Sequence, residues 1–227
     1  MSERGRARPA ARGDGLEPRS DPQLPSGRHG LPREEVLSNQ RERILRALAA
    51  TIARYGYDGS SVERIVKRAG VSRRTFYEQF ADREQAYLEA YDEAAGCLLE
   101  RLRAAWEEPG GGAGQLRQCL RSMLETVAAE PRLARTFMID VLAVGPPALE
   151  RRERHMRSFA ALLERGARAH DGSPAPPLAA DGLAAAIYEA VLTRVSRGQT
   201  EELPGLLEDL HSFCLMIFHY SAVAEPS

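Results

Sequence analysis

The chain has 227 residues, of which 43% are hydrophobic, and its formal net charge is −1. This size allows one larger domain with a buried core and a small attached module. The three cysteines show no paired spacing, and the sequence has no signal-like apolar start and no apolar run near the roughly 20 residues that cross a bilayer. These features argue against disulfide-stapled and membrane-spanning proteins, so we expect a cytoplasmic protein with reduced thiols.

The small net charge hides an uneven distribution. Residues 41–83 carry ten basic and five acidic side chains, whereas residues 84–227 carry fourteen basic and twenty-one acidic ones. The acidic part would repel a polyanion. This split argues against general coating of nucleic acid and favours one docking face on DNA.

Residues 1–33 are rich in Arg, Gly and Pro and lack an apolar period, which predicts a disordered tail. The run Arg4-Gly5-Arg6-Ala7-Arg8-Pro9 is similar to the Arg-Gly-Arg hooks that enter the minor groove of A·T-rich DNA. Ala7 interrupts the hook and acidic residues follow it. A solvated tail without a DNA contact is therefore the alternative.

Two helices are expected next. The first spans about residues 34–55, where apolar side chains recur at helical spacing. The second is short, begins at a cap formed by Ser60 or Ser61, and ends at Gly70. The apolar stripe of the first helix consists of Ile44, Leu45, Leu48 and Ile52.

A third short helix begins at Ser72, with Phe76 and Phe80 four residues apart on its buried face. Two short helices joined by a glycine turn form a helix-turn-helix, so we assign residues 34–83 to a DNA-binding module. Arginine can donate two hydrogen bonds to guanine or to a phosphate, the threonine methyl can contact the thymine methyl, and the tyrosine hydroxyl can donate a hydrogen bond to a phosphate. The candidates on the outside of this helix are Arg73, Arg74, Thr75 and Tyr77.

This segment resembles the DNA-binding part of the TetR family of bacterial transcriptional regulators. The matching residues are Ala69-Gly70-Val71-Ser72, Thr75-Phe76-Tyr77, Phe80 and Arg83-Glu84, with Val66 standing where the family has a small Ala. The resemblance implies phosphate contacts for Ser61, at a Thr position of the family, and for Arg83, at a Lys position. Ser72 completes the predicted DNA-binding set.

The rest of the chain predicts an all-α fold. A long helix capped by Asp82 and reaching Trp106 begins at the DNA-binding module and enters the second domain, so it is the natural lever between them. We assign residues 84–221 to a helical domain for effector binding and dimerisation. Its further helices are expected at about 115–129, 131–144, 146–169, 178–197 and 203–220, with a loop over 171–177.

The resemblance implies a homodimer in which the last two helices pair with their copies to form a four-helix bundle. The segment from Phe213 to Phe218 agrees with this, because a helix that is apolar over so wide an arc needs partners on more than one side. A monomeric core is the alternative. Two recognition helices one DNA turn apart would read a palindromic operator.

The resemblance also implies a small-molecule site in the second domain. Aromatic and Met side chains line such pockets, although they also fill cores. Asp140, between Ile139 and Val141, should face a cavity or be neutralised by Arg135 or Arg152. The candidate effector-binding residues are Trp106, Phe137, Met138, Asp140, Met156 and Phe159.

No cofactor or metal site is expected. His211 and Cys214 stand three apart on one helix, but a third ligand is missing because His219 lies two turns further on. Core packing or a dimer contact is the preferred interpretation of these residues.

The leading hypothesis is a homodimeric transcriptional regulator, a repressor, that binds a palindromic operator and leaves it when a small effector binds. A helical enzyme is disfavoured, because no Gly-x-Ser-x-Gly, His-Glu-x-x-His or Gly-x-Gly-x-x-Gly motif occurs. An architectural DNA-binding protein without an effector and a transcriptional activator are the alternatives, since the position of the operator decides between repression and activation.

Overall fold

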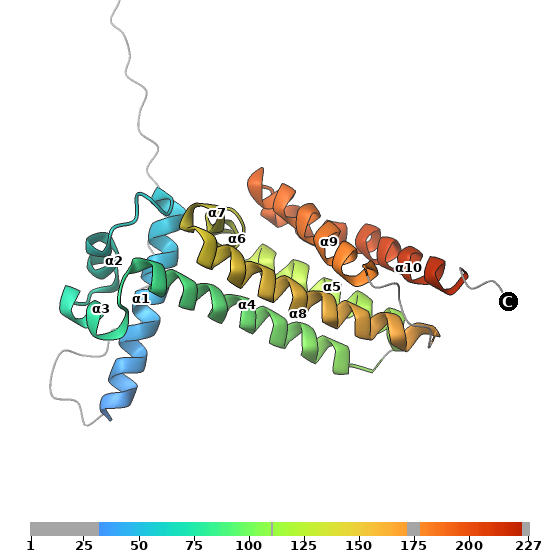
Figure 1. Cartoon of the computed structure of the whole chain (residues 1–227), viewed down its shortest axis with the longest axis horizontal. Coiled ribbons are helices and arrows are strands. Elements are labelled where there is room, and N and C mark those ends of the chain that lie inside the picture. Colours follow the sequence, from blue (N-terminus) through green and yellow to red (C-terminus); the bar gives the residue numbers. More distant parts are fainter. Residues whose placement is uncertain (1–31, 110, 172–177, 224–227) are drawn as a thin grey trace, which may run out of the picture.

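The computed structural model describes residues 32–109, 111–171 and 178–223, and within these ranges every regular element is a helix (Figure 1). The all-α prediction is therefore confirmed. The run containing Arg4, Arg6 and Arg8 lies outside the described residues, as do residues 172–177 of the predicted loop over 171–177; Asp171 ends a helix instead. The elements are α1 (Arg33–Tyr55), α2 (Val62–Ala69), α3 (Arg73–Gln79), α4 (Arg83–Glu107), α5 (Gly111–Ala129), α6 (Pro131–Met138), α7 (Val141–Val144), α8 (Pro146–Asp171), α9 (Ala179–Ser196), the 3-10 helix η1 (Thr200–Leu206) and α10 (Leu207–Val223).

The helix-turn-helix has the caps that its sequence predicts. The Ser61 side chain accepts a hydrogen bond from the Arg64 amide at 3.4 Å, and the Ser72 side chain accepts one from the Thr75 amide at 2.9 Å. Gly70 ends α2 in the left-handed region at φ +64°, which suits a residue without a side chain. Ser61 rather than Ser60 is thus the cap of α2, since the Ser60 hydroxyl donates to the Gly56 carbonyl at 2.7 Å.

The long helix α4 connects the two domains. Asp82 caps it by accepting a hydrogen bond from the Gln85 amide at 2.7 Å. From its start beside α3, α4 runs into the second domain next to α5 and α8 (Figure 1). A change at the far end of this helix can therefore reach the DNA-binding module without crossing a loop.

Several boundaries differ from the sequence-based expectation. The helix α5 begins at Gly111, ahead of the expected start at about 115. Residues 131–144 form two helices, because the helical hydrogen-bond pattern changes at Asp140. The Asp140 amide donates to the Arg135 carbonyl, five residues back, at 3.3 Å. Residues 200–206 form a 3-10 helix before α10 begins at Leu207. Pro204 lies within that segment and lacks the amide hydrogen that an α-helix would use.

Two apolar cores follow from this arrangement. The second domain has its own core, built mainly from α4, α5, α8, α9 and α10. The core of the DNA-binding module combines α1, α2 and α3 with the start of α4, and also includes Val141, Val144 and Ala148. The break before α7 thus places part of the second domain's sequence against the DNA-binding module.

No helix in the described ranges is both long enough and apolar enough to span a membrane.

Candidate DNA-binding face and effector cavity

The outer side of α3 presents polar side chains to solvent, while Phe76 and Phe80 are buried beneath it. The Arg74 side chain is 89% exposed and its Nε lies 2.9 Å from Glu78 Oε1, one turn further along the helix. Tyr77 is 49% exposed, with its ring edge-to-face with Phe76 at 5.4 Å between centroids. Arg73 is exposed as well. The helix is therefore anchored on one side and open on the other.

The hydroxyls of the DNA-binding candidates take part in caps. Ser72 Oγ lies 2.9 Å from Thr75 Oγ1 as well as accepting the Thr75 amide hydrogen, and Ser61 caps α2. These interactions fix the start of each helix. Contacts of Ser61, Ser72 and Thr75 with DNA remain a prediction.

Arg83 is held inside the module. Its Nη1 donates to the carbonyls of Tyr57 at 2.8 Å and Ser60 at 2.9 Å, and its Cζ lies 4.0 Å from the centroid of the Tyr57 ring. Arg83 therefore fixes the α1–α2 turn to the start of α4. Its predicted phosphate contact would have to use the remaining guanidinium nitrogens.

Two further arginines near the candidate face also bind within the protein. Arg41 pairs with Glu89 at 2.5 Å and with Glu93 at 2.9 Å, which ties α1 to α4. Arg43 donates to the carbonyls of Ala69 and Gly70 at the end of α2. Both side chains stabilise the packing of the module.

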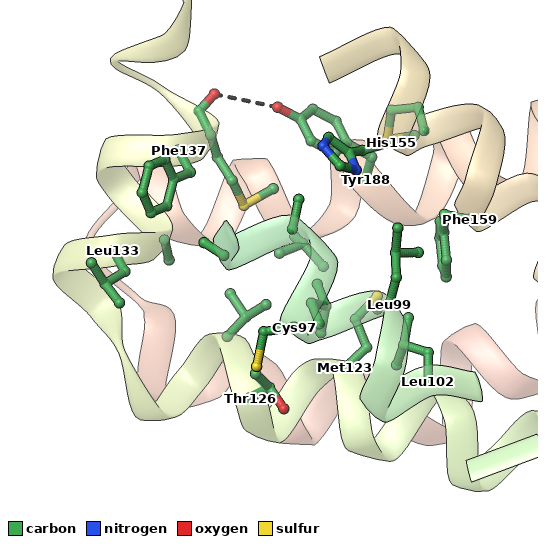
Figure 2. Close-up of a pocket in the computed structure, with 18 of the residues that line it drawn as sticks. Cys97, Leu99, Leu102, Met123, Thr126, Leu133, Phe137, His155, Phe159 and Tyr188 are labelled. Carbon is green, nitrogen blue, oxygen red and sulfur yellow. Dashed lines mark hydrogen bonds between the residues drawn. The ribbon is translucent and has the colours of Figure 1, made fainter. Parts of the chain in front are cut away.

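The second domain contains a cavity of about 350 Å³ between α4, α5, α6, α8 and α9 (Figure 2). Its wall is mostly apolar. Four of the six predicted effector residues line it, namely Phe137, Met138, Met156 and Phe159. Trp106 and Asp140 are not among the lining residues: Trp106 is buried in the core of the second domain.

Asp140 lies at the break between α6 and α7. Its Oδ2 is buried and has no hydrogen-bond partner among the described residues. Burial raises the pKa of this carboxyl, and the charge of Arg135 opposes that rise only in part. Within the described ranges neither Arg135 nor Arg152 forms the expected ion pair with it, so Asp140 is a buried acceptor without a partner rather than half of a salt bridge.

One end of the cavity carries polar side chains that were not among the predicted effector residues. Tyr91, Arg152, His155 and Tyr188 line the wall there, with Arg152 Cζ 4.4 Å from the centroid of the Tyr188 ring. Residues 152, 155, 156 and 159 recur at the spacing of one helix face. Together with the predicted Met156 and Phe159, this spacing was the available signal.

The surroundings of His155 favour its neutral imidazole form. Its Nε2 lies 2.8 Å from Asp92 Oδ1, but the other oxygen of Asp92 pairs with Arg151. Burial, followed by the charges of Arg154 and Arg151, lowers the pKa of His155 despite this carboxylate. At neutral pH the ring therefore acts as a hydrogen-bond donor or acceptor at the cavity wall.

Phe137 belongs to both domains. It lines the cavity, and its ring packs against Tyr87 and Tyr91 at centroid distances of 5.9 and 5.6 Å. The core of the DNA-binding module includes both tyrosines. A ligand that fills the cavity would therefore contact Phe137 and, through it, affect the packing of Tyr87 and Tyr91 in the core of the DNA-binding module.

The possible metal pair is used in packing. His211 Nε2 lies 3.0 Å from the Ala113 carbonyl oxygen, and burial raises the pKa of the Cys214 thiol to about 12. Among the described residues no three His, Cys, Asp or Glu side chains gather as a metal site.

The comparison with known proteins identifies the module. Residues 44–90 match the model of the bacterial regulatory proteins of the tetR family. Residues 44–90 are thus a DNA-binding segment of the tetR type. The family and the curated relatives that the chain matches are transcriptional regulators and not enzymes.

The chain is similar to two curated proteins over about half of its length. The HTH-type transcriptional regulator RutR of Escherichia coli K12 is 26% identical over 114 residues, which are 50% of this chain and 53% of RutR. The fatty acid metabolism regulator protein of Bacillus subtilis is 27% identical over 98 residues, 43% of this chain and 50% of that protein. The chain thus spans about half the length of the curated relatives it matches.

The similarity to solved structures extends over more of the chain than the similarity to the curated proteins. The fatty acid degradation regulator FadR of Bacillus halodurans has a TM-score of 0.69 at 21% identity, over 78% of this chain and 94% of that one. FadR of Bacillus subtilis, solved in complex with stearoyl-CoA, also has a TM-score of 0.69 at 21% identity, over 76% of this chain and 96% of that one. At this identity the likeness establishes a shared fold.

Proposed function

We propose that this chain is a homodimeric transcriptional repressor of the TetR type, which binds a palindromic DNA operator through α2 and α3 and releases it when a small molecule fills the cavity. The observation that carries the proposal is the position of Phe137, which lines the cavity and packs against the core of the DNA-binding module. One side chain thereby links the two activities that such a repressor needs.

The DNA-binding half of the proposal rests on α3. Arg73, Arg74 and Tyr77 are exposed on a helix whose other side is fixed by Phe76 and Phe80. The surrounding segment 41–83 has an excess of five positive charges. A rigid helix that presents arginine and tyrosine side chains, within a segment of net positive charge, is suited to binding in the major groove.

The effector half rests on the cavity. A volume of about 350 Å³ falls within the range of roughly 300–1,000 Å³ that is common for small-molecule sites. Its apolar wall favours a ligand with a long apolar body. The stearoyl-CoA complex of the structurally similar FadR supports an acyl chain as one such body. The cavity also favours an effector-dependent regulator over an architectural DNA-binding protein.

Release requires that the effector prefer one spacing of the paired DNA-binding modules. A coupling free energy of about 1–3 kcal/mol between the two sites is enough. Two routes lead from the cavity to the module: the continuous helix α4, and α6, whose Phe137 contacts Tyr87 and Tyr91. Both are packed helical elements that can shift as units.

Dimerisation is proposed through α9 and α10, which lie side by side on the outside of the second domain (Figure 1). Ala185 and Ala186 are exposed on α9, and Met216 of α10 is 61% exposed. Small side chains let helices of two subunits approach closely, and an exposed Met gains from burial between them. The pair would form the four-helix bundle of a dimer.

The direct test is fluorescence anisotropy with a duplex from the region upstream of the protein's own gene and a scrambled duplex of equal length, over a salt series. We expect sequence-dependent binding with two subunits per duplex. Weak binding to both duplexes with equal salt slopes would contradict the proposal, because it would mean that only the basic face is engaged.

A further inference from the structure

The cavity has two chemically different ends. Figure 2 shows Tyr188 and His155 on one side of the cavity and Cys97 and Thr126 on the opposite side, with apolar side chains between them. At the first end Tyr188 donates a hydrogen bond to the Met138 carbonyl at 3.3 Å. A molecule that fills the cavity would therefore meet the phenol of Tyr188 and the imidazole of His155 at one end of a mostly apolar chamber.

Arg152 is the cation at the Tyr188 end, and it has no acidic partner there. Its Nε is buried and has no hydrogen-bond partner among the described residues. Its guanidinium instead lies over the Tyr188 ring, with Cζ 4.4 Å from the centroid. A buried donor on a charged group is costly to leave unpaired, so the site favours a ligand that supplies an acceptor.

The nearby carboxylate is already occupied. Asp92 binds Arg151 through one oxygen and His155 through the other. Asp140, which the sequence suggested as a partner for Arg152, forms no ion pair with it among the described residues and does not line the cavity. At the Tyr188 end of the cavity, a bound ligand would therefore meet the positive charge of Arg152.

We propose that Arg152 is the anchor for an anionic head group, a carboxylate in the simplest case, of an effector whose apolar chain extends toward Met156 and Phe159. This inference rests on the proposed effector function and names the class of ligand. A carboxylate matches the planar fork of the guanidinium and would satisfy its Nε, as in other bidentate arginine pairs. The apolar wall holds the chain.

The other charged residues of the cavity wall do not offer such a site. Arg101 and Glu130 both line the cavity, but both side chains are exposed to solvent and they are opposite in charge. An ion pair with an exposed arginine adds little. Arg101 is therefore the matched control for Arg152, because it is the same residue type at the same cavity.

The test compares dodecanoate with dodecan-1-ol by isothermal titration calorimetry at pH 7.5, in the absence of DNA. The probes share one chain and differ in the charge of the head group. We expect the wild-type chain to bind dodecanoate at least about tenfold more tightly, the ratio that a charge-assisted hydrogen bond supports. In Arg152→Gln the two dissociation constants should become equal, with a wild-type circular dichroism spectrum and urea midpoint as evidence of an intact fold.

Two further variants complete the design. Arg152→Lys should restore part of the preference, because it keeps the charge and loses the fork. Arg101→Gln should keep the full preference. Equal binding of both probes to wild type, no binding of dodecanoate, a preference that survives Arg152→Gln, or one that disappears in Arg101→Gln would each overturn the proposal.

The regulator function is tested apart from the anchor. The same proteins are titrated with operator DNA by anisotropy, with and without dodecanoate. An Arg152-dependent preference in a chain that binds no specific DNA would overturn the repressor function alone. Specific DNA binding with equal affinity for the two probes would overturn the anchor alone.

Discussion

The side chains of Tyr87 and Thr136 connect three helices. The Tyr87 hydroxyl on α4 donates a hydrogen bond to the Thr136 carbonyl on α6 at 3.0 Å, and the Thr136 hydroxyl donates to the Ala49 carbonyl on α1 at 3.4 Å. Both residues are fully buried, and burial raises the pKa of Tyr87, so the phenol stays protonated as a donor. The chain of contacts joins the effector domain to the DNA-binding module.

Tyr87→Phe should lower the free energy of unfolding by about 1–3 kcal/mol, because it leaves a buried carbonyl without its donor. Urea denaturation measures this change. Tyr55→Phe is the control, since Tyr55 is exposed and its loss of a hydroxyl should change little. A Tyr87→Phe protein as stable as wild type would show that the hydrogen bond contributes nothing to stability.

Arg74→Ala should abolish specific DNA binding while leaving the dimer and the helix content intact, and Tyr77→Ala should do the same. The Arg74–Glu78 pair that is lost is an exposed one and contributes at most about 1 kcal/mol. Anisotropy, circular dichroism and sedimentation test the three properties. Arg103→Ala on the exposed side of α4 is the control. Wild-type operator affinity in Arg74→Ala would remove Arg74 from the recognition face.

Phe137→Leu should uncouple the two sites. The smaller side chain keeps the cavity apolar but loses the aromatic contacts with Tyr87 and Tyr91, which contribute about 0.5–1.5 kcal/mol each. We expect operator binding to persist and saturating effector to release less DNA. Phe159→Leu is the matched control, because Phe159 lines the cavity and packs in the core of the second domain. It should weaken effector binding and leave release at saturation complete.

Asp140→Asn should stabilise the protein at pH 7.5 by about 1 kcal/mol, because it removes a buried charge that has no partner among the described residues. The folded pKa of Asp140 is raised, so the wild-type penalty is present above that pKa and is lost as the carboxyl is protonated on lowering the pH toward its ordinary range. Urea denaturation of both proteins from pH 7.5 to pH 4.5 should give curves that converge. A constant difference would mean that Asp140 does not titrate as a buried group.

The sequence by itself determined the local structure of the DNA-binding module. Ser72 and Asp82 cap helices because their side-chain oxygens reach amides three residues on, and Gly70 ends α2 because its backbone turns to positive φ. Such interactions lie within a few residues of chain, so spacing and residue type are enough to predict them. The α-helical class and most helix boundaries follow in the same way.

The tertiary structure decided which side chains share the cavity. Phe137 and Arg152 lie on different helices, and nothing in their spacing indicates that one borders the DNA-binding module or that the other faces Tyr188. The break at Asp140 likewise depends on packing, because α7 turns aside to bury Val141 and Val144 against the DNA-binding module. Contacts between distant segments are set by how whole helices pack, and that packing is the sum of many small apolar terms that no local pattern records.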